Sequence, residues 1–184
     1  MANIDKTHKH AIARWEFAGF IFINIIGSLM HFVFDWFGRC RPLALIAAVY
    51  ESTWEHLKLA FWPALIFSLI EYKYLRMKAR NFFLAKTLSF YTVPVFIAFL
   101  FYVYMWVIGH DVLFLDILIF VVAVGVGQLV SYMLLTTKQL TISSAKSVAI
   151  FLAILILTFL LFTFFPPHVF LFKDPVTGGY GIID

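Results

Sequence analysis

Five long apolar runs alternate with short polar segments along the 184-residue chain. A membrane-spanning helix needs about 20 consecutive, predominantly apolar residues. Each run reaches that length, and the second exceeds what one crossing requires. Pro166 and Pro167 end the last run, because proline lacks the backbone donor that a helix interior uses. We therefore predict an all-α bundle of five membrane-spanning helices, at about residues 15–37, 43–72, 82–108, 112–135 and 145–165.

The remaining residues, 166–184, are rich in turn-forming types. Gly178, Gly179 and Gly181 follow no strand and open no helix, which indicates turns rather than a phosphate-binding loop. We expect a structured C-terminal tail outside the bundle. The chain shows no internal repeat, so residues 1–184 are interpreted as one transmembrane domain, with an uncleaved first span.

Composition supports a bilayer environment. Hydrophobic residues make up 63% of the chain and charged residues only 13%, against roughly a quarter charged in ordinary soluble domains. The net charge of +4 does not indicate a nucleic-acid partner, because the basic residues sit mostly in the loops between apolar runs. Cys40 is the only cysteine, which excludes an intramolecular disulfide and a thiolate metal cage.

The loop charges predict an orientation. Cytoplasmic loops of membrane proteins carry an excess of lysine and arginine. With the N-terminus inside, the inner segments hold nine basic residues and the outer ones three, so we predict N-terminus in and C-terminus out. The inner residues are Lys6, Lys9, Arg14, Lys73, Arg76, Lys78, Arg80, Lys138 and Lys146, and the outer ones are Arg39, Arg41 and Lys173.

This orientation sends most acids and histidines to the outer end, from separate parts of the chain. We expect them to converge there, with five inner exceptions: Asp5, His8, His10, Glu16 and Glu71. The outer set is His31, Asp35, Glu51, Glu55, His56, His110, Asp111, Asp116, His168 and Asp174, together with Lys58.

The second run carries the densest group of ionisable residues. Such side chains cost roughly 3 kcal/mol each at membrane depth on insertion scales, so they are rare and usually functional. On one continuous helix, Glu51, Glu55 and Lys58 would share a narrow stripe, where lysine can pair with glutamate. His56 would face another neighbour. A helix crossing the interface with paired charges and no substrate is the plainer explanation.

The first run has a polar stripe of its own, formed by Asn24, Ser28, His31 and Asp35. His31 and Asp35 are four residues apart, which suits two metal ligands or a carboxylate that orients an imidazole. The same stripe, extended to Glu16, would suit a proton or ion path. Hydrogen bonds between helices, worth about 0.6 kcal/mol each, are the alternative without a ligand.

These two runs lead to our main functional hypothesis, an outward-facing polar pocket that binds a divalent metal and activates water for hydrolysis of a lipid-like or membrane-borne substrate. Nitrogen and oxygen donors suit Zn, Mn or Fe without selecting among them. The zinc-protease pattern His-Glu-x-x-His is absent. The candidate ligands are His31, Asp35, Glu51 and Glu55, and the candidate catalytic residues are Glu51, Glu55, His56 and Lys58, with Lys58 stabilising negative charge.

Two other classes stay open. A transporter or channel for protons, ions or a small solute would use the first-helix stripe, and five spans would favour a homo-oligomer. A non-catalytic subunit of a membrane assembly would need the charges only for stability and partner binding.

The string Glu51-Ser-Thr-Trp-Glu-His-Leu-Lys58, His31-Phe32 upstream, and the tail segment from Asp174 to Ile182 resemble a family catalogued as domain of unknown function 6512. The resemblance covers nearly the whole chain. It implies a small prokaryotic membrane protein with several spans, located in the cytoplasmic membrane, whose activity is uncharacterised.

Overall fold

The computed structural model describes residues 5–140 and 145–182. Within them the chain forms five long helices and no strand; Lys173 and Tyr180 make an isolated β-bridge. The all-helical prediction is thereby confirmed. The long helices are α1 (Lys6–Trp36), α2 (Thr53–Leu75), α3 (Phe82–Ile108), α4 (Leu113–Thr136) and α5 (Ala145–Phe164), and two short 3₁₀ helices are η1 (Arg41–Leu45) and η2 (Phe170–Phe172).

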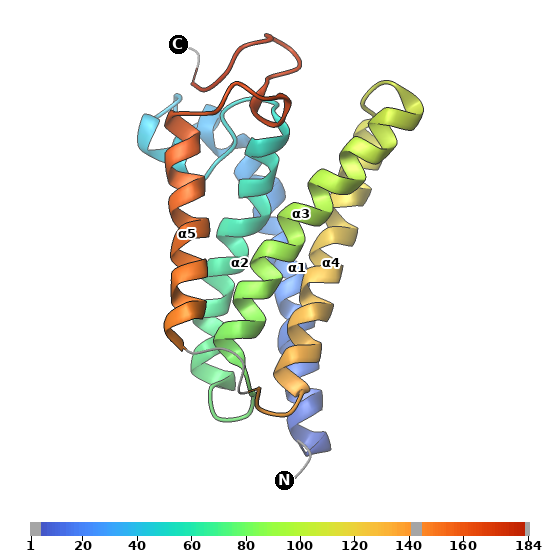
Figure 1. Ribbon diagram of the computed structural model, residues 1–184, viewed down its shortest axis with the longest axis vertical. Helices are drawn as coiled ribbons and strands as arrows, with labels where there is room; N and C mark the ends of the chain where they lie inside the picture. Colours follow the sequence, from blue (N-terminus) through green and yellow to red (C-terminus); the bar gives the residue numbers. More distant parts are fainter. Residues whose placement is uncertain (1–4, 141–144, 183–184) are drawn as a thin grey trace.

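The helices run side by side along the long axis of the molecule (Figure 1). Helices α1, α2, α3 and α4 pack in a closed ring, in which each contacts the next and α4 returns to α1. Helix α5 packs against α3, and its Phe159 ring stacks on Phe61 of α2, 4.7 Å between centroids. The N-terminus lies at one end of the bundle and the C-terminal tail at the other, where the α3–α4 hairpin leans away from α5 (Figure 1).

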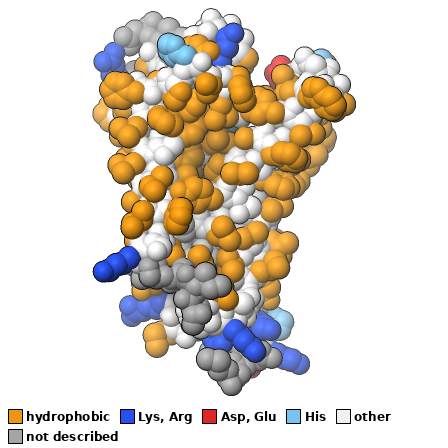
Figure 2. Space-filling view, in the orientation of Figure 1, with side chains coloured by type: hydrophobic (Ala, Val, Ile, Leu, Met, Phe, Trp, Pro, Cys, Tyr) orange, Lys and Arg blue, Asp and Glu red, His pale blue; other side chains and the backbone are white. Residues whose placement is uncertain are grey.

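The surface is that of a protein in a lipid bilayer. Among the described residues, α1, α3, α4 and the Lys146–Phe164 part of α5 are long and apolar enough to cross a membrane. Figure 2 shows hydrophobic side chains over the length of the bundle, with lysine and arginine gathered mainly at the N-terminal end. Every long helix exposes large apolar side chains, for example Phe17, Leu69, Phe99, Leu118 and Leu157.

Helix α2 is not among those four. It carries Glu55, Lys58 and Glu71, all fully buried against the other helices. Its polar residues therefore face protein rather than lipid, which is where ionisable groups in a membrane bundle are tolerated.

The start of α2 differs from the sequence prediction. The second run was expected to be helical from about residue 43, but η1 and an irregular segment at residues 46–52 come first, and α2 begins at Thr53. Ser52 is the N-cap, and its hydroxyl accepts a hydrogen bond from the Glu55 N–H at 3.4 Å. Glu51 therefore precedes the helix, and the expected stripe of Glu51, Glu55 and Lys58 on one helix face does not form.

Glycines let neighbouring helices approach each other closely at two places in the bundle. A Cβ on Gly27 would lie 2.6 Å from the carbonyl oxygen of Leu59 in α2, so only glycine fits there. Gly127 of α4 plays the same part against α3, where a Cβ would lie 2.3 Å from Val93 Cγ2. Gly27 lies one helical turn before His31, so the close approach brings His31 next to the first turn of α2.

Candidate functional site

His31, Glu51 and His56 meet at the end of the bundle that carries the C-terminal tail. There α1, the segment before α2 and the first turn of α2 come together. Oε2 of Glu51 lies 3.6 Å from His31 Nε2 and 3.5 Å from His56 Nε2. The imidazole centroids are 5.2 Å apart. Each residue offers one ligand atom, and these atoms lie within 4.8 Å of one another. The side chains are partly exposed, so an ion from solution can reach them.

The backbone of the N-cap orients His56. Its Nδ1 lies 2.9 Å from the carbonyl oxygen of Ser52. A carbonyl oxygen only accepts, so Nδ1 carries the hydrogen and, in the neutral ring, Nε2 keeps a free lone pair that points towards Glu51. A hydrogen bond from the second ring nitrogen is what usually fixes the orientation of a metal-ligating histidine.

The protonation state of Glu51 is also that of a metal ligand. The neighbouring His31 imidazole, followed by His56, holds the pKa of the Glu51 carboxyl below its ordinary value, although partial burial acts against them. The carboxylate is therefore ionised at neutral pH. Two imidazoles and one carboxylate form a donor set of catalytic zinc sites, which leave a further position open for water or substrate.

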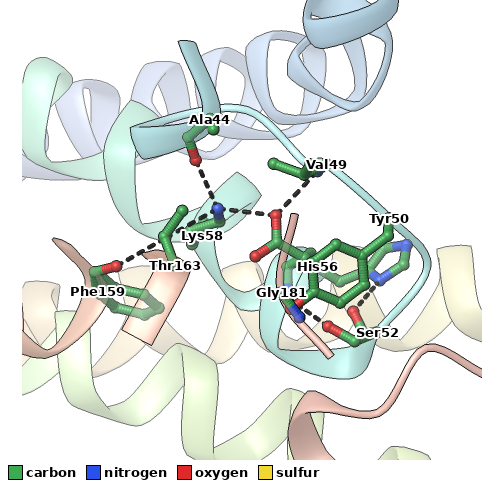
Figure 3. Close-up of polar contacts among 10 residues, drawn as sticks. Ala44, Val49, Tyr50, Ser52, His56, Lys58, Phe159, Thr163 and Gly181 are labelled. Atoms are coloured by element: carbon green, nitrogen blue, oxygen red, sulfur yellow. Dashed lines mark hydrogen bonds and ion pairs between the residues drawn. The ribbon is translucent and has the colours of Figure 1, made fainter. Parts of the chain in front are cut away.

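Glu55 and Lys58 form a separate, buried ion pair, and Figure 3 shows Lys58 with its partners Ala44 and Thr163. Lys58 Nζ lies 2.8 Å from Glu55 Oε2 and donates to Ala44 O at 2.8 Å and Thr163 Oγ1 at 3.1 Å, while the Val49 N–H donates to Glu55 Oε2 at 2.8 Å. Both side chains are 0% exposed. All three hydrogens of the ammonium group thus have acceptors inside the protein. The predicted roles of Glu55 as ligand and Lys58 as catalytic cation gain no support from this geometry.

Asp35 also lies outside the His31 group. It is exposed and its Oδ1 receives a hydrogen bond from Arg39 Nε at 3.2 Å. The other two polar residues of the predicted stripe form hydrogen bonds within α1. The Asn24 side chain donates to Phe20 O, and the Ser28 hydroxyl donates to Asn24 O. In the described part of the chain, no hydrogen bond joins these two side chains to another helix.

The other polar residues of this end do not converge on the site. The Tyr104 hydroxyl donates to Asp116 at the start of α4, and His168 stacks on Tyr180 with 4.6 Å between ring centroids. Asp174 closes its own turn by accepting from the Val176 N–H and the Thr177 hydroxyl. The expectation that the outer acids and histidines share one cavity is therefore too broad. Of that set, only His31, Glu51 and His56 come together among the described residues.

Sequence reasoning missed a second group of charges, at the opposite end of the bundle. Lys86 of α3 lies 2.7 Å from Glu16 Oε1 of α1 and 2.5 Å from Glu71 Oε2 of α2. From α4, the Ser131 hydroxyl donates to Glu16 Oε1 at 2.8 Å, and the Gln128 amide to the Glu16 carbonyl at 3.3 Å. The signal was Lys86 itself, because a lysine inside a predicted span requires an interior partner.

Comparison with known proteins gives one match. A family model described as a family of unknown function (DUF6512) matches residues 4–182. No curated protein and no solved structure matches the chain. Function therefore has to be inferred from the chain's own geometry.

Proposed function

Because the chain belongs to the family of unknown function DUF6512, we propose its role from its own site: a membrane protein that binds a divalent transition metal through His31, Glu51 and His56. The ion would activate water for hydrolysis of a membrane-borne, lipid-like substrate. The observation that carries the proposal is the placement of three ligand atoms, from three separate segments, within 4.8 Å of one another.

The donors fit such an ion. Two neutral imidazoles and a carboxylate suit zinc, and the same combination holds iron in another class of enzymes, so the donor set favours a transition metal over calcium or magnesium. When bound, the ion supplies Lewis-acid activation of a water molecule. The chain supplies orientation: the Ser52 carbonyl fixes the ring of His56 at 2.9 Å, and the Gly27 approach fixes α1 beside α2. Glu51 would supply the carboxylate ligand.

The location of the site supports a membrane-borne substrate. The three residues lie at the end of an apolar bundle, partly exposed, where a polar headgroup meets the bilayer surface. We place this end outside the cytoplasmic membrane of a prokaryotic cell, because the basic loop residues gather mainly at the opposite end (Figure 2).

Removing one histidine should abolish stoichiometric metal binding. Purified protein supplied with zinc should retain the ion through dialysis, as measured by elemental analysis. His31→Ala and His56→Ala should each weaken binding by more than the 10–100-fold typical of losing an outer hydrogen-bond partner. His168→Ala is the matched control, because that ring stacks on Tyr180 in the tail and should leave metal content unchanged. A metal-free wild type, or unchanged content in His31→Ala, would refute the metal site.

Metal affinity should fall as the pH drops below about 6.5, the ordinary pKa of histidine, because both imidazoles must be neutral to bind. The lowered pKa of Glu51 keeps its carboxylate ionised through this range, so the loss reports on two histidine protons. Competition with a chromophoric chelator across the pH range would measure it. Glu51→Gln should lower affinity at every pH and keep the steep slope; affinity that stays constant from about pH 7.5 to 5.5 would contradict histidine ligation.

Transport of protons, ions or a small solute is the second candidate. The observation that favours it is the buried group of Glu16, Glu71 and Lys86 in the other half of the bundle. Of the predicted first-helix stripe, Glu16 belongs to this group, whereas the side chains of Asn24 and Ser28 donate hydrogen bonds to carbonyls of their own helix.

A further inference from the structure

Three ionisable side chains from three helices meet inside the bundle, far along the chain from the candidate metal ligands. Glu16 of α1, Glu71 of α2 and Lys86 of α3 are 4%, 0% and 5% exposed. The fourth helix of the ring, α4, adds only neutral groups, the Ser131 hydroxyl and the Gln128 amide.

The charges of this cluster do not balance. Two carboxylates and one ammonium group leave a net charge of −1 if every member is ionised. An uncompensated charge is costly inside a protein, and two carboxylates that share one site do not both ionise readily. One additional monovalent cation restores neutrality, and a proton is the smallest that fits between side chains already 2.5–2.7 Å from the same nitrogen.

Three buried oxygen atoms mark where that proton would sit. Glu16 uses Oε1 to accept a hydrogen bond from Lys86, whereas Glu16 Oε2 and both carboxyl oxygens of Glu71 have no hydrogen-bond partner within the described ranges, and Glu71 Oε2 meets Lys86 as an ion pair only. Buried polar atoms without partners are uncommon in native proteins and call for a specific reason. A proton on either carboxyl group turns one of these acceptors into a donor.

A groove connects the cluster with the surface. It runs between α1 and α4, has a volume of about 330 Å³, and is lined by Glu16 and Gln128 together with apolar residues such as Phe20 and Tyr132. Gly125 in its wall carries no side chain to fill it. Glu16 is thus a member of the buried cluster and also lines the groove, which places the groove directly beside the cluster.

We propose that Glu16, Glu71 and Lys86 form a proton-binding site, in which the two carboxyl groups hold one exchangeable proton that enters and leaves through the α1–α4 groove. The site is independent of the His31 group and of any metal. Release of the proton leaves a negative charge where α1, α2 and α3 meet, so the protonation state bears on how these helices pack.

Infrared spectroscopy of the full-length protein in lipid nanodiscs tests this directly. At neutral pH the spectrum should contain the C=O stretching band of a protonated carboxylic acid, which shifts in D₂O and disappears reversibly at alkaline pH. Glu16→Gln and Glu71→Gln should each abolish the band, because one carboxylate then pairs one to one with Lys86. Glu51→Gln, which removes a glutamate outside the cluster, is the control and should retain it.

Three results would overturn the proposal: no such band at neutral pH, a band that survives in both glutamine variants, or a band that sodium chloride removes while choline chloride does not. The last would identify a sodium site instead. Glutamine imitates a neutral carboxylic acid, so both variants should fold, as gel filtration would check. If one of the glutamine variants does not fold, Ser131→Ala takes its place. Loss of the hydrogen bond from Ser131 to Glu16 should shift the infrared band, so an unshifted band would count against the proposal.

Discussion

Replacing Lys58 with methionine should destabilise the protein by about 3–5 kcal/mol, the usual cost of stranding one member of a buried ion pair. The change leaves the Glu55 carboxylate 0% exposed and without its cation, and removes the hydrogen bonds to Ala44 and Thr163. Denaturant or thermal unfolding of the purified protein in detergent micelles would measure the loss.

The partner substitution makes this test specific. In Lys58→Met combined with Glu55→Gln, the buried charge is gone, so most of the lost stability should return. Lys73→Met is the matched control on the same helix, because Lys73 is exposed, and should change stability by no more than about 0.5 kcal/mol. If Lys58→Met changed stability as little as Lys73→Met does, Glu55 and Lys58 would not depend on each other.

Replacing Trp54 with alanine should release the C-terminal tail and cost about 3–5 kcal/mol, as large-to-small changes in packed cores do. Trp54, on the first turn of α2, is 6% exposed. Its ring contacts Phe159 of α5 at 4.8 Å and Phe172 of η2 at 4.6 Å between centroids. One side chain therefore joins α2, α5 and the tail.

Limited trypsin digestion reads out this release. Cleavage after Lys173 requires the tail to leave its bridge with Tyr180, so Trp54→Ala should be cut faster than the wild type. Trp36→Ala offers the control, since Trp36 is 64% exposed at the end of α1, its ring contacts Phe32 of the same helix, and its loss should leave the cleavage rate unchanged. Equal rates for the two variants would mean that the tail is held by other contacts.

The helices were predictable because an apolar run of about 20 residues in a bilayer has few alternatives to a helix. Hydropathy failed at residues 46–52, since it reports burial and says nothing of backbone conformation. A better signal was present in Ser52-Thr-Trp-Glu55, which has the spacing of a capping box and marks a helix N-terminus. Reading it would have placed Glu51 outside the helix.

The three residues that meet were all predicted as candidates, but Asp35 and Glu55 were predicted as ligands and His56 was expected to face away from the glutamates. His31, Glu51 and His56 stood out as ionisable residues in apolar runs, and that argument needs no structure. Which of them meet depends on the close approach of α1 at Gly27 and on the turn before Ser52, and periodicity along one helix reveals neither. The Glu16, Glu71 and Lys86 cluster was missed because the lysine in the third run was not matched with the inner acids, and hydropathy does not show which runs are neighbours.

The segment before α2 is held in place by contacts with side chains of α2 and with the C-terminal tail. The Val49 N–H binds Glu55, Ala44 O binds Lys58, and the Tyr50 hydroxyl accepts from the Gly181 N–H at 3.2 Å. Glu51 thus owes its position beside the histidines to an ion pair it never touches. A substitution that changes this pair would therefore also shift the carboxylate that is proposed to bind the metal, which couples the stability of the bundle to the geometry of the site.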